Sequence, residues 1–171
     1  PAAQAEDSAV TAAAEDPGDL TPASKPDPDE TVRAAASSVR VWPVSGTTLL
    51  EYSVDALAYN PTTRDWRTHE GLDLAAALGD PVCAAADGTV YTIYEDERYG
   101  TTVVLRHSGG FTTHYANLSE EPDVAVGDTV RAGQRLGTVG QTALTETGDA
   151  PHVHFALYNG NTPEDPAEYW Q

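Results

Sequence analysis

The chain has 171 residues with 9 basic and 27 acidic side chains, so its formal net charge is −18. This length allows one domain, or one domain with a tail. No apolar run approaches the roughly 18–20 residues that a membrane-spanning helix needs. The negative charge would repel a phosphate backbone, which argues against nucleic-acid binding. The single cysteine, Cys83, excludes an internal disulfide framework and a zinc site built from several cysteines.

Residues 1–40 have the composition of a flexible acidic linker rich in alanine and proline. They contain no aromatic residue and five of the 12 prolines. Such a segment cannot bury enough apolar surface to offset the entropy of ordering it, so we expect a disordered tail. A short helix within residues 29–38 is the alternative. Because the chain begins at Pro1 and contains no methionine, we expect a trimmed N-terminal segment, with the linker spacing the domain from a membrane anchor.

Residues 41–171 have the pattern of an all-β domain. This part holds 13 of the 14 glycines, and short runs rich in Val, Thr, Leu and Tyr alternate with glycine-containing turns. Strands separated by such turns at intervals near ten residues are typical of a β-sandwich or barrel. The expected strands are 48–53, 69–75, 82–85, 88–95, 101–107, 111–118, 128–131, 135–139 and 152–158.

Two of these strands carry polar side chains among apolar ones. Side chains alternate between the two faces of a strand, so His69, Gly71 and Asp73 are expected to share one face. Leu72 and Leu74 then point to the core. A buried polar face costs stability unless something binds there, which makes this segment a candidate binding site.

The second polar segment is His152-Val153-His154-Phe155, in which the two imidazoles share a face. Two strands of this kind can together supply His, Asp and His to a single ion. Imidazole nitrogens with a carboxylate oxygen suit Zn²⁺, and three protein ligands leave a fourth position open for water, as in catalytic zinc sites. The alternative for each histidine taken singly is a surface residue or one satisfied by ordinary hydrogen bonds.

Three further polar residues receive other interpretations. Glu70 lies on the strand face opposite His69, so it is not assigned as a general base. His114 is expected to point away from the face that Tyr115 and Asn117 share. His107, before a Ser-Gly-Gly sequence, is interpreted as a turn residue.

In this order, the two histidine segments and the glycine-rich stretches between them resemble the lysostaphin-type (LytM-like) zinc endopeptidases. The resemblance implies an antiparallel β-sandwich/barrel hybrid with an open groove. It also implies hydrolysis of peptide bonds in bacterial peptidoglycan, and therefore a location outside the cytoplasm. The residues that carry the resemblance are His69-x-x-x-Asp73, His152-x-His154, and the stretches 42–46, 84–90, 126–130 and 133–140.

The resemblance also implies a role for each site residue. His69, Asp73 and His154 match the zinc ligands, and His152 matches a non-ligand histidine that faces the zinc-bound water. The family usually has one more catalytic histidine, in a Tyr-x-His-Leu string, and this chain has Asn117 at that position. Asparagine can donate a hydrogen bond but cannot accept and return a proton near neutral pH, so we expect weakened activity.

Within the family, the sequence is most similar to the stage II sporulation protein Q branch. The likeness lies in residues 59–69, in Asn117, and in residues 142–146. That branch is implicated in a membrane-anchored intercellular complex, in which the peptidase-like domain binds a partner protein and hydrolysis is often lost. Ala156 replaces the glutamate that usually follows His-x-His-Phe, and the sequence assigns no role to Ala156 or Glu146.

Two functions from different classes follow. The first is a zinc endopeptidase acting on peptidoglycan peptides, with Tyr115 and Trp66 lining its substrate groove. The second is a zinc-loaded but weak or inactive module that docks an envelope partner protein. For the two aromatic residues, ordinary packing is the alternative. The acidic surface suits a basic protein partner, and a plain solvated surface is the alternative there.

Overall fold

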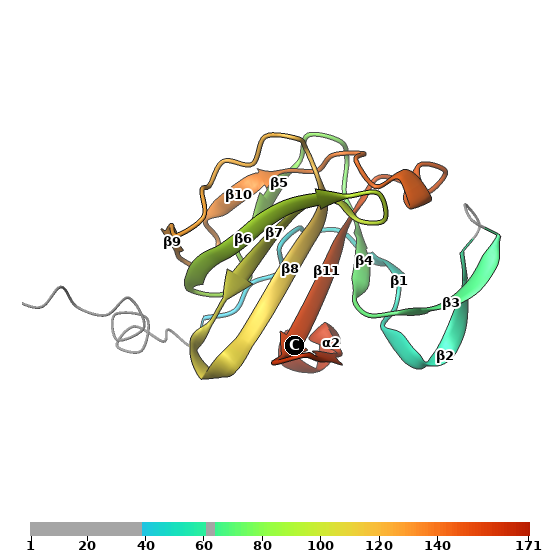
Figure 1. The fold of residues 1–171 in the computed structure, drawn as a ribbon, viewed down its shortest axis with the longest axis horizontal. Coiled ribbons are helices and arrows are strands. Elements are labelled where there is room, and N and C mark those ends of the chain that lie inside the picture. The colour runs from blue at the N-terminus through green and yellow to red at the C-terminus, as the bar shows by residue number, and fades with distance from the viewer. Residues whose placement is uncertain (1–38, 61–63) are drawn as a thin grey trace, which may run out of the picture.

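The computed structural model describes residues 39–60 and 64–171 (Figure 1). The expected linker at 1–40 and its alternative helix at 29–38 lie outside the described residues, except for residues 39 and 40. Within the described ranges, no helix is long and apolar enough to cross a membrane.

The described residues form an all-β fold in which every strand pair is antiparallel. This confirms the expected fold class. One short helix, α2 (Pro166–Tyr169), and two 3₁₀ turns, η1 (Ser108–Gly110) and η2 (Leu144–Glu146), are the helical elements of these residues. The strands are β1 (Thr48–Leu50), β2 (Ser53–Asn60), β3 (Asp65–His69), β4 (Leu72–Ala75), β5 (Pro81–Cys83), β6 (Gly88–Asp96), β7 (Gly100–Arg106), β8 (Phe111–Leu118), β9 (Thr129–Val130), β10 (Arg135–Thr138), β11 (His152–Asn159) and β12 (Thr162–Glu164).

One large sheet dominates the molecule. Its strands neighbour one another in the order β1-β4-β11-β8-β7-β6-β9, and β12 pairs with β11. Two small sheets complete the fold: β5 pairs with β10, and β2 with β3. In Figure 1, the β2–β3 hairpin stands apart from the body of the domain.

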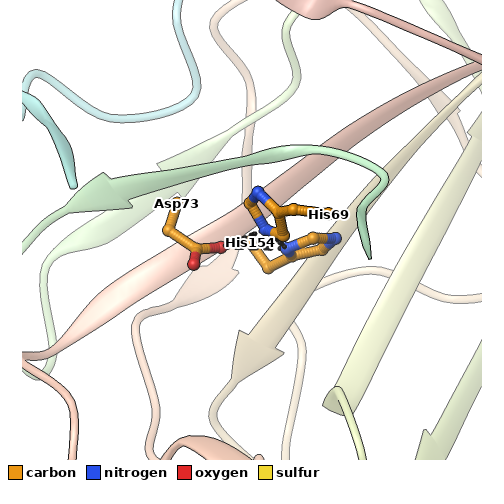
Figure 2. Close-up of side chains that lie close together, drawn as sticks. All are labelled: His69, Asp73 and His154. Carbon is orange, nitrogen blue, oxygen red and sulfur yellow. Dashed lines mark hydrogen bonds and ion pairs between the residues drawn. The ribbon is translucent and has the colours of Figure 1, made fainter. Parts of the chain in front are cut away.

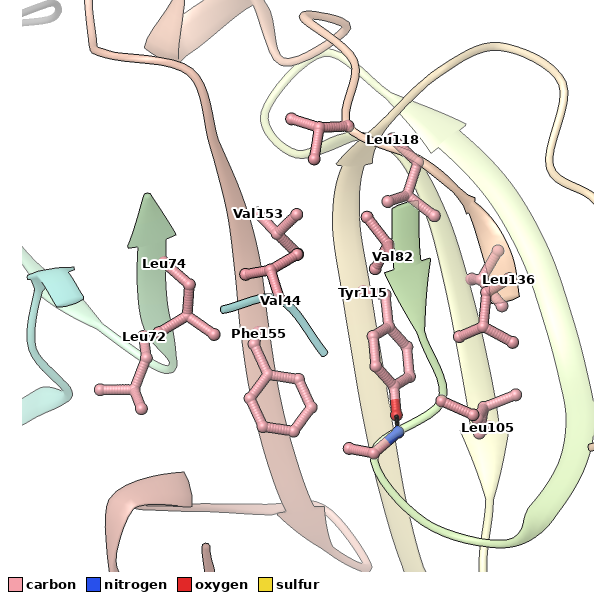
Figure 3. Packing of buried hydrophobic residues seen from close by; sticks show 14 of the residues in the cluster. Val44, Leu72, Leu74, Val82, Leu105, Tyr115, Leu118, Leu136, Val153 and Phe155 are labelled. Atoms are coloured by element: carbon pink, nitrogen blue, oxygen red, sulfur yellow. Dashed lines mark hydrogen bonds between the residues drawn. The ribbon is translucent and has the colours of Figure 1, made fainter. Parts of the chain in front are cut away.

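The hydrophobic core includes side chains from both the large sheet and the β5–β10 pair (Figure 3). Val82 of β5 and Leu136 of β10 are fully buried with residues of the large sheet. On β11, Val153 and Phe155 belong to this core, as the alternation of side chains predicts. Each such side chain contributes about 1.5–3 kcal/mol by its burial. The opposite face of β11 is therefore the one that presents its histidines.

The expected strand 69–75 is wrong as a single element, because the chain bends within it. β3 ends at His69 and β4 begins at Leu72. At the bend, a Cβ on Gly71 would lie 2.7 Å from the carbonyl oxygen of Phe155. Glycine is therefore required where the bend presses against β11.

Two more departures from the expected strands have a common cause. The β2–β3 hairpin and β12 were not expected, and most of their residues are exposed or half-buried. A strand that covers no core lacks the apolar alternation by which a sequence reveals it.

His107 is not a simple turn residue, because its ring belongs to a chain of hydrogen bonds. Nδ1 donates to the carbonyl of Asp87 at 2.7 Å, and Nε2 accepts from the Thr113 hydroxyl at 2.7 Å. That hydroxyl also lies 2.9 Å from the hydroxyl of Tyr115, which accepts from the Ala85 N–H. Both ring nitrogens are thus used in the neutral form of the imidazole.

This arrangement predicts an acid-sensitive contribution to stability. Burial lowers the pKa of His107, so the unfolded chain takes up this proton at higher pH than the folded chain does. The stabilising contribution is complete above about pH 6.5 and is lost as pH falls through the folded pKa. We expect the difference in free energy of unfolding between the wild type and His107→Gln, measured by urea denaturation, to be smaller at pH 5 than at pH 7.5. The same difference at both pH values would contradict this account.

Candidate metal centre

Three elements bring His69, Asp73 and His154 together (Figure 2). His69 is the last residue of β3, and the bend at Gly71 turns the chain into β4. On β4, Asp73 lies directly opposite His154 of β11 in the antiparallel register. All three residues are buried. The geometry therefore follows from one strand register and one bend.

The three side chains converge on a single point. Oδ1 of Asp73 lies 2.9 Å from Nδ1 of His154 and 3.1 Å from Nε2 of His69. The two imidazole nitrogens are 3.1 Å apart. One ligand atom from each residue thus lies within 4.8 Å of the other two.

The tautomer of His69 decides what these atoms need. Its Nδ1 lies 2.9 Å from the carbonyl oxygen of Glu51, and since a carbonyl can only accept, Nδ1 carries the proton. In the neutral ring, Nε2 is then an acceptor that faces the acceptor oxygen of Asp73. A proton can bridge one pair of such atoms, whereas a divalent cation can bind all three. Two imidazole nitrogens and one carboxylate oxygen fit Zn²⁺.

Asp73 supplies a fixed negative charge at this point. Burial by itself raises the pKa of its carboxyl group, but the contacts with the His154 and His69 imidazoles outweigh burial and hold that pKa well below its usual range. The group is therefore a carboxylate at neutral pH, as a metal ligand must be.

His152 lies beside the cluster at the start of β11 and is itself buried. Its Nδ1 donates to the carbonyl of Ala150 at 2.8 Å. This bond fixes the tautomer, and Nε2 becomes the nitrogen that can accept a proton. His152, His69 and Asp73 line the same pocket.

That pocket has a volume of about 420 Å³ and three walls. The first wall comes from β1 and the β2–β3 hairpin, the second from the turn between β6 and β7, and the third from the loop before β11. Its lining residues are Leu49, Leu50, Ala58, Tyr59, Asn60, Arg67, Thr68, His69, Asp73, Arg98, Tyr99, Gly148, Asp149, Ala150 and His152.

Asn117 is buried near this site as a structural clamp. Its Oδ1 accepts hydrogen bonds from the backbone N–H groups of Thr142 and Ala143 at 3.0 and 3.1 Å. Its Nδ2 donates to the carbonyl of His152 at 3.2 Å. One amide thus ties the loop before β11 to the start of β11, where His152 lies.

The backbone of Asn117 is also unusual, with a φ of +61°. Asparagine tolerates this left-handed conformation better than most residues do. The conformation interrupts the simple alternation of side chains along β8. For this reason, strand alternation cannot place the side chain of Asn117 on the same face as that of Tyr115, as the sequence analysis expected.

The clamp predicts a clear loss of stability on substitution. Asn117→Ala removes the acceptor of two N–H groups and leaves alanine at positive φ. We expect the free energy of unfolding to fall by about 2–4 kcal/mol. Asn117→Gly is the matched control, because it loses the same hydrogen bonds without the backbone strain and should be about 1 kcal/mol less destabilising. Wild-type stability in Asn117→Ala, measured by chemical denaturation, would rule out the clamp.

The expectation that Tyr115 and Trp66 line the substrate groove is wrong for Tyr115. Its ring is fully buried in the hydrophobic core, with its centroid 5.4 Å from that of Phe155. Trp66 is 65% exposed and packs against Tyr59 across the β2–β3 hairpin, at 5.5 Å between ring centroids. Tyr59 lines the pocket and Trp66 does not. The β5–β10 layer covers the face of β8 on which Tyr115 lies, which strand alternation alone could not reveal.

His114 and Glu70 lie outside the pocket lining. The ring of His114 packs on Tyr158 at 4.6 Å, and burial, together with the charge of His154, lowers the pKa of His114 to about 4. The hydroxyl of Tyr158 donates to the Glu70 carboxylate at 2.9 Å. Ala156 lies opposite His114 in the register of β8 and β11, and its side chain provides no polar group at that position.

Sequence reasoning missed Arg98, which lines the pocket from the β6–β7 turn beside Tyr99. The ring of Tyr99 stacks on that of His154, with centroids 4.8 Å apart and planes inclined by 30°. No local pattern in the sequence predicts this contact, because β7 and β8 separate the turn from β11 along the chain.

Gly71 leaves space that a larger residue would take from His154. An added Cβ would lie 2.9 Å from both Cε1 and Nε2 of that ring. We therefore expect Gly71→Ala to displace the ring and to weaken zinc affinity about 10–100-fold, measured by competition with a chelating dye. Gly137→Ala is the control, since its Cβ would meet its nearest neighbour at an ordinary 3.5 Å. Equal zinc affinity in the two variants would contradict this role of Gly71.

Comparison with known proteins assigns the family. The protein-family model described as Peptidase family M23 matches residues 67–166 of the sequence. The chain belongs to peptidase family M23. This confirms the resemblance to lysostaphin-type enzymes, since the catalytic domain of lysostaphin from Staphylococcus simulans is 27% identical with a TM-score of 0.62, covering 79% of this chain and 98% of that domain.

Other members extend the likeness of this M23 domain. The DD-carboxypeptidase/endopeptidase Mpg of Neisseria meningitidis is 39% identical over 107 residues, which are 63% of this chain and 24% of that protein. The chain therefore spans about a quarter of that relative. A zinc-containing peptidase from Vibrio cholerae is 26% identical with a TM-score of 0.60, covering 78% of this chain and 41% of that one. A chain of the SpoIIQ–SpoIIIAH pore-forming complex is 26% identical with a TM-score of 0.63, covering 79% and 93%.

Proposed function

We propose that this chain is a zinc-dependent peptidase domain that hydrolyses peptide bonds of peptidoglycan outside the cytoplasm. One observation carries the proposal: candidate ligand atoms of His69, Asp73 and His154 lie 2.9–3.1 Å from one another in a pocket that His152 also lines. Membership of family M23 supports it. The relative named DD-carboxypeptidase/endopeptidase supports peptides with D-amino acids as the substrate class.

The residues of the site would have different roles in the reaction. His69, Asp73 and His154 would hold the ion, which supplies Lewis acidity and lowers the pKa of a water molecule at this site. His152 would accept a proton from that water molecule at Nε2, because its Nδ1–H donates to the carbonyl of Ala150. The pocket would orient the peptide above these groups and exclude bulk water.

We further propose that Asn117 weakens catalysis. Its amide cannot act as an acid or a base near neutral pH, and its hydrogen bonds to the backbone of Thr142, Ala143 and His152 already engage it. A general acid–base group contributes roughly 10²–10⁴-fold to a rate. His152 would then be the single histidine that transfers protons at this centre.

A second candidate function is a zinc-binding module that docks a partner protein of the cell envelope. The structural use of Asn117 favours it, as does the likeness to a chain of the SpoIIQ–SpoIIIAH complex. The β2–β3 hairpin supports it as well, because Leu57, Tyr59 and Trp66 are large apolar residues exposed on this projecting element.

Zinc content and hydrolysis together separate the two functions. We expect the wild type to bind one equivalent of zinc by mass spectrometry and to release peptides slowly from purified peptidoglycan. Asp73→Ala should lose the zinc, and a chelator should abolish release. His152→Ala should keep the zinc and lose about 10²–10⁴-fold in rate.

The opposite results are equally informative. A zinc-loaded wild type that yields no product after prolonged incubation would reject the peptidase and leave the docking module. A wild type that binds no zinc would reject both proposals.

A further inference from the structure

Arg98 is the pocket residue whose chemistry the proposed reaction leaves unexplained. It lies in the exposed turn between β6 and β7, and its Cζ lies 4.7 Å from the centroid of the Tyr99 ring. Tyr99 in turn stacks on His154. Guanidinium, phenol and imidazole thus follow one another from the rim of the pocket to the candidate metal ligands.

Hydrogen bonds hold this turn on both sides. Oδ1 of Asp96 accepts from the backbone N–H groups of Arg98 and Tyr99 at 2.9 and 2.6 Å. The carbonyl of Arg98 accepts from the Thr145 hydroxyl at 2.9 Å. The backbone of Asn117 also donates to the carbonyl of Tyr99 at 2.8 Å. The base of the Arg98 side chain is therefore fixed relative to the cluster.

The two arginines that line the pocket differ in their ion pairing. Arg67 is ion-paired with Asp65 at 2.7 Å. Arg98 forms no ion pair with any side chain that the structure describes, and Asp149 is the remaining charged lining residue besides Asp73. A positive charge at the rim of the pocket, in a chain with net charge −18, favours a local anion that the rest of the surface would repel.

The position of the guanidinium determines which anion fits. Because Cζ lies 4.7 Å from the centroid of the Tyr99 ring, a guanidinium stacked on that ring would keep its N–H donors at its edge, where a ligand can reach them. A planar fork of N–H donors matches the two oxygens of a carboxylate. A peptide bound with its scissile amide at the cluster would bring a carboxylate within one or two residues of that amide to the rim.

We propose that Arg98 binds a carboxylate of the substrate peptide and makes the pocket selective for peptides that carry a free acidic group next to the scissile bond. This inference rests on the proposed peptidase function. The carboxylate is either the C-terminus of the peptide or an acidic side chain. Arg98 is thus a residue that determines specificity.

Three short peptides test the inference with the zinc-loaded full chain. Acetyl-D-alanyl-D-alanine carries a terminal carboxylate, its C-terminal amide carries none, and acetyl-D-glutamyl-D-alanine amide carries one on a side chain. Dissociation constants are measured by calorimetry at low temperature, with peptide integrity checked by mass spectrometry. We expect at least one acidic peptide to bind about tenfold more tightly than the amide, and the one that does identifies the source of the carboxylate.

Two arginine variants complete the design. Arg98→Gln should abolish the preference for the acidic peptide while zinc content and thermal unfolding stay unchanged. Arg106→Gln is the matched control, because Arg106 also lies over a tyrosine, Tyr91 at 3.9 Å, but is not part of the pocket lining. This variant should keep the preference.

Each contrary result has a defined meaning. Equal binding of all three peptides by the wild type would overturn the inference, as would a preference that persists in Arg98→Gln, which would indicate a carboxylate bound by the metal. A chain that hydrolyses peptidoglycan without this preference retains the proposed function and loses the role of Arg98. A chain that shows the preference without hydrolysis retains the role of Arg98 and loses the peptidase.

Discussion

Two imidazole nitrogens, from His69 and His154, meet one carboxylate oxygen of Asp73, and the organisation of the site depends on this contact. Nε2 of His69 is an acceptor because a backbone carbonyl holds the proton on Nδ1. It faces the Asp73 oxygen across 3.1 Å of buried space. Two acceptor atoms at this distance repel each other unless a proton or a cation lies between them, so the contact suits the metal ion of the proposed function. The β4–β11 register and the bend at Gly71 deliver that geometry.

Asn117 connects this centre to the loops around it. One buried amide links the loop before β11 to the strand that carries His152, and the backbone of the same residue contacts Tyr99. From the family resemblance, we expect a proton-transferring histidine at this position. In this chain the side chain there positions its neighbours, so the acid–base chemistry of the proposed reaction falls to His152.

The walls of the pocket differ in character from its floor. The floor includes Asp73 of β4 and His152 of β11, whose positions the large sheet fixes. The walls come from the projecting β2–β3 hairpin, the β6–β7 turn and the loop before β11, which are the kinds of segment that carry specificity on a rigid scaffold. Arg98 belongs to such a wall, and its contact with Tyr99 connects it to the cluster beneath.

Local patterns in the sequence were sufficient for the fold class and for the residues that gather at the centre. Alternation along β11 separates Val153 and Phe155 from His152 and His154, because successive side chains of a strand point to opposite faces. The same rule united His69 with Asp73, although the chain bends between them.

Only the tertiary structure decided which surfaces are covered and what the loops contribute. Tyr115 lies in the core because a second layer, β5–β10, packs over that face of β8. The left-handed backbone of Asn117 breaks the alternation on which its expected orientation depended. Arg98 reaches the pocket through stacking between segments far apart in the chain. A period of two residues tells which side chains share a face, but not which other part of the chain packs against that face.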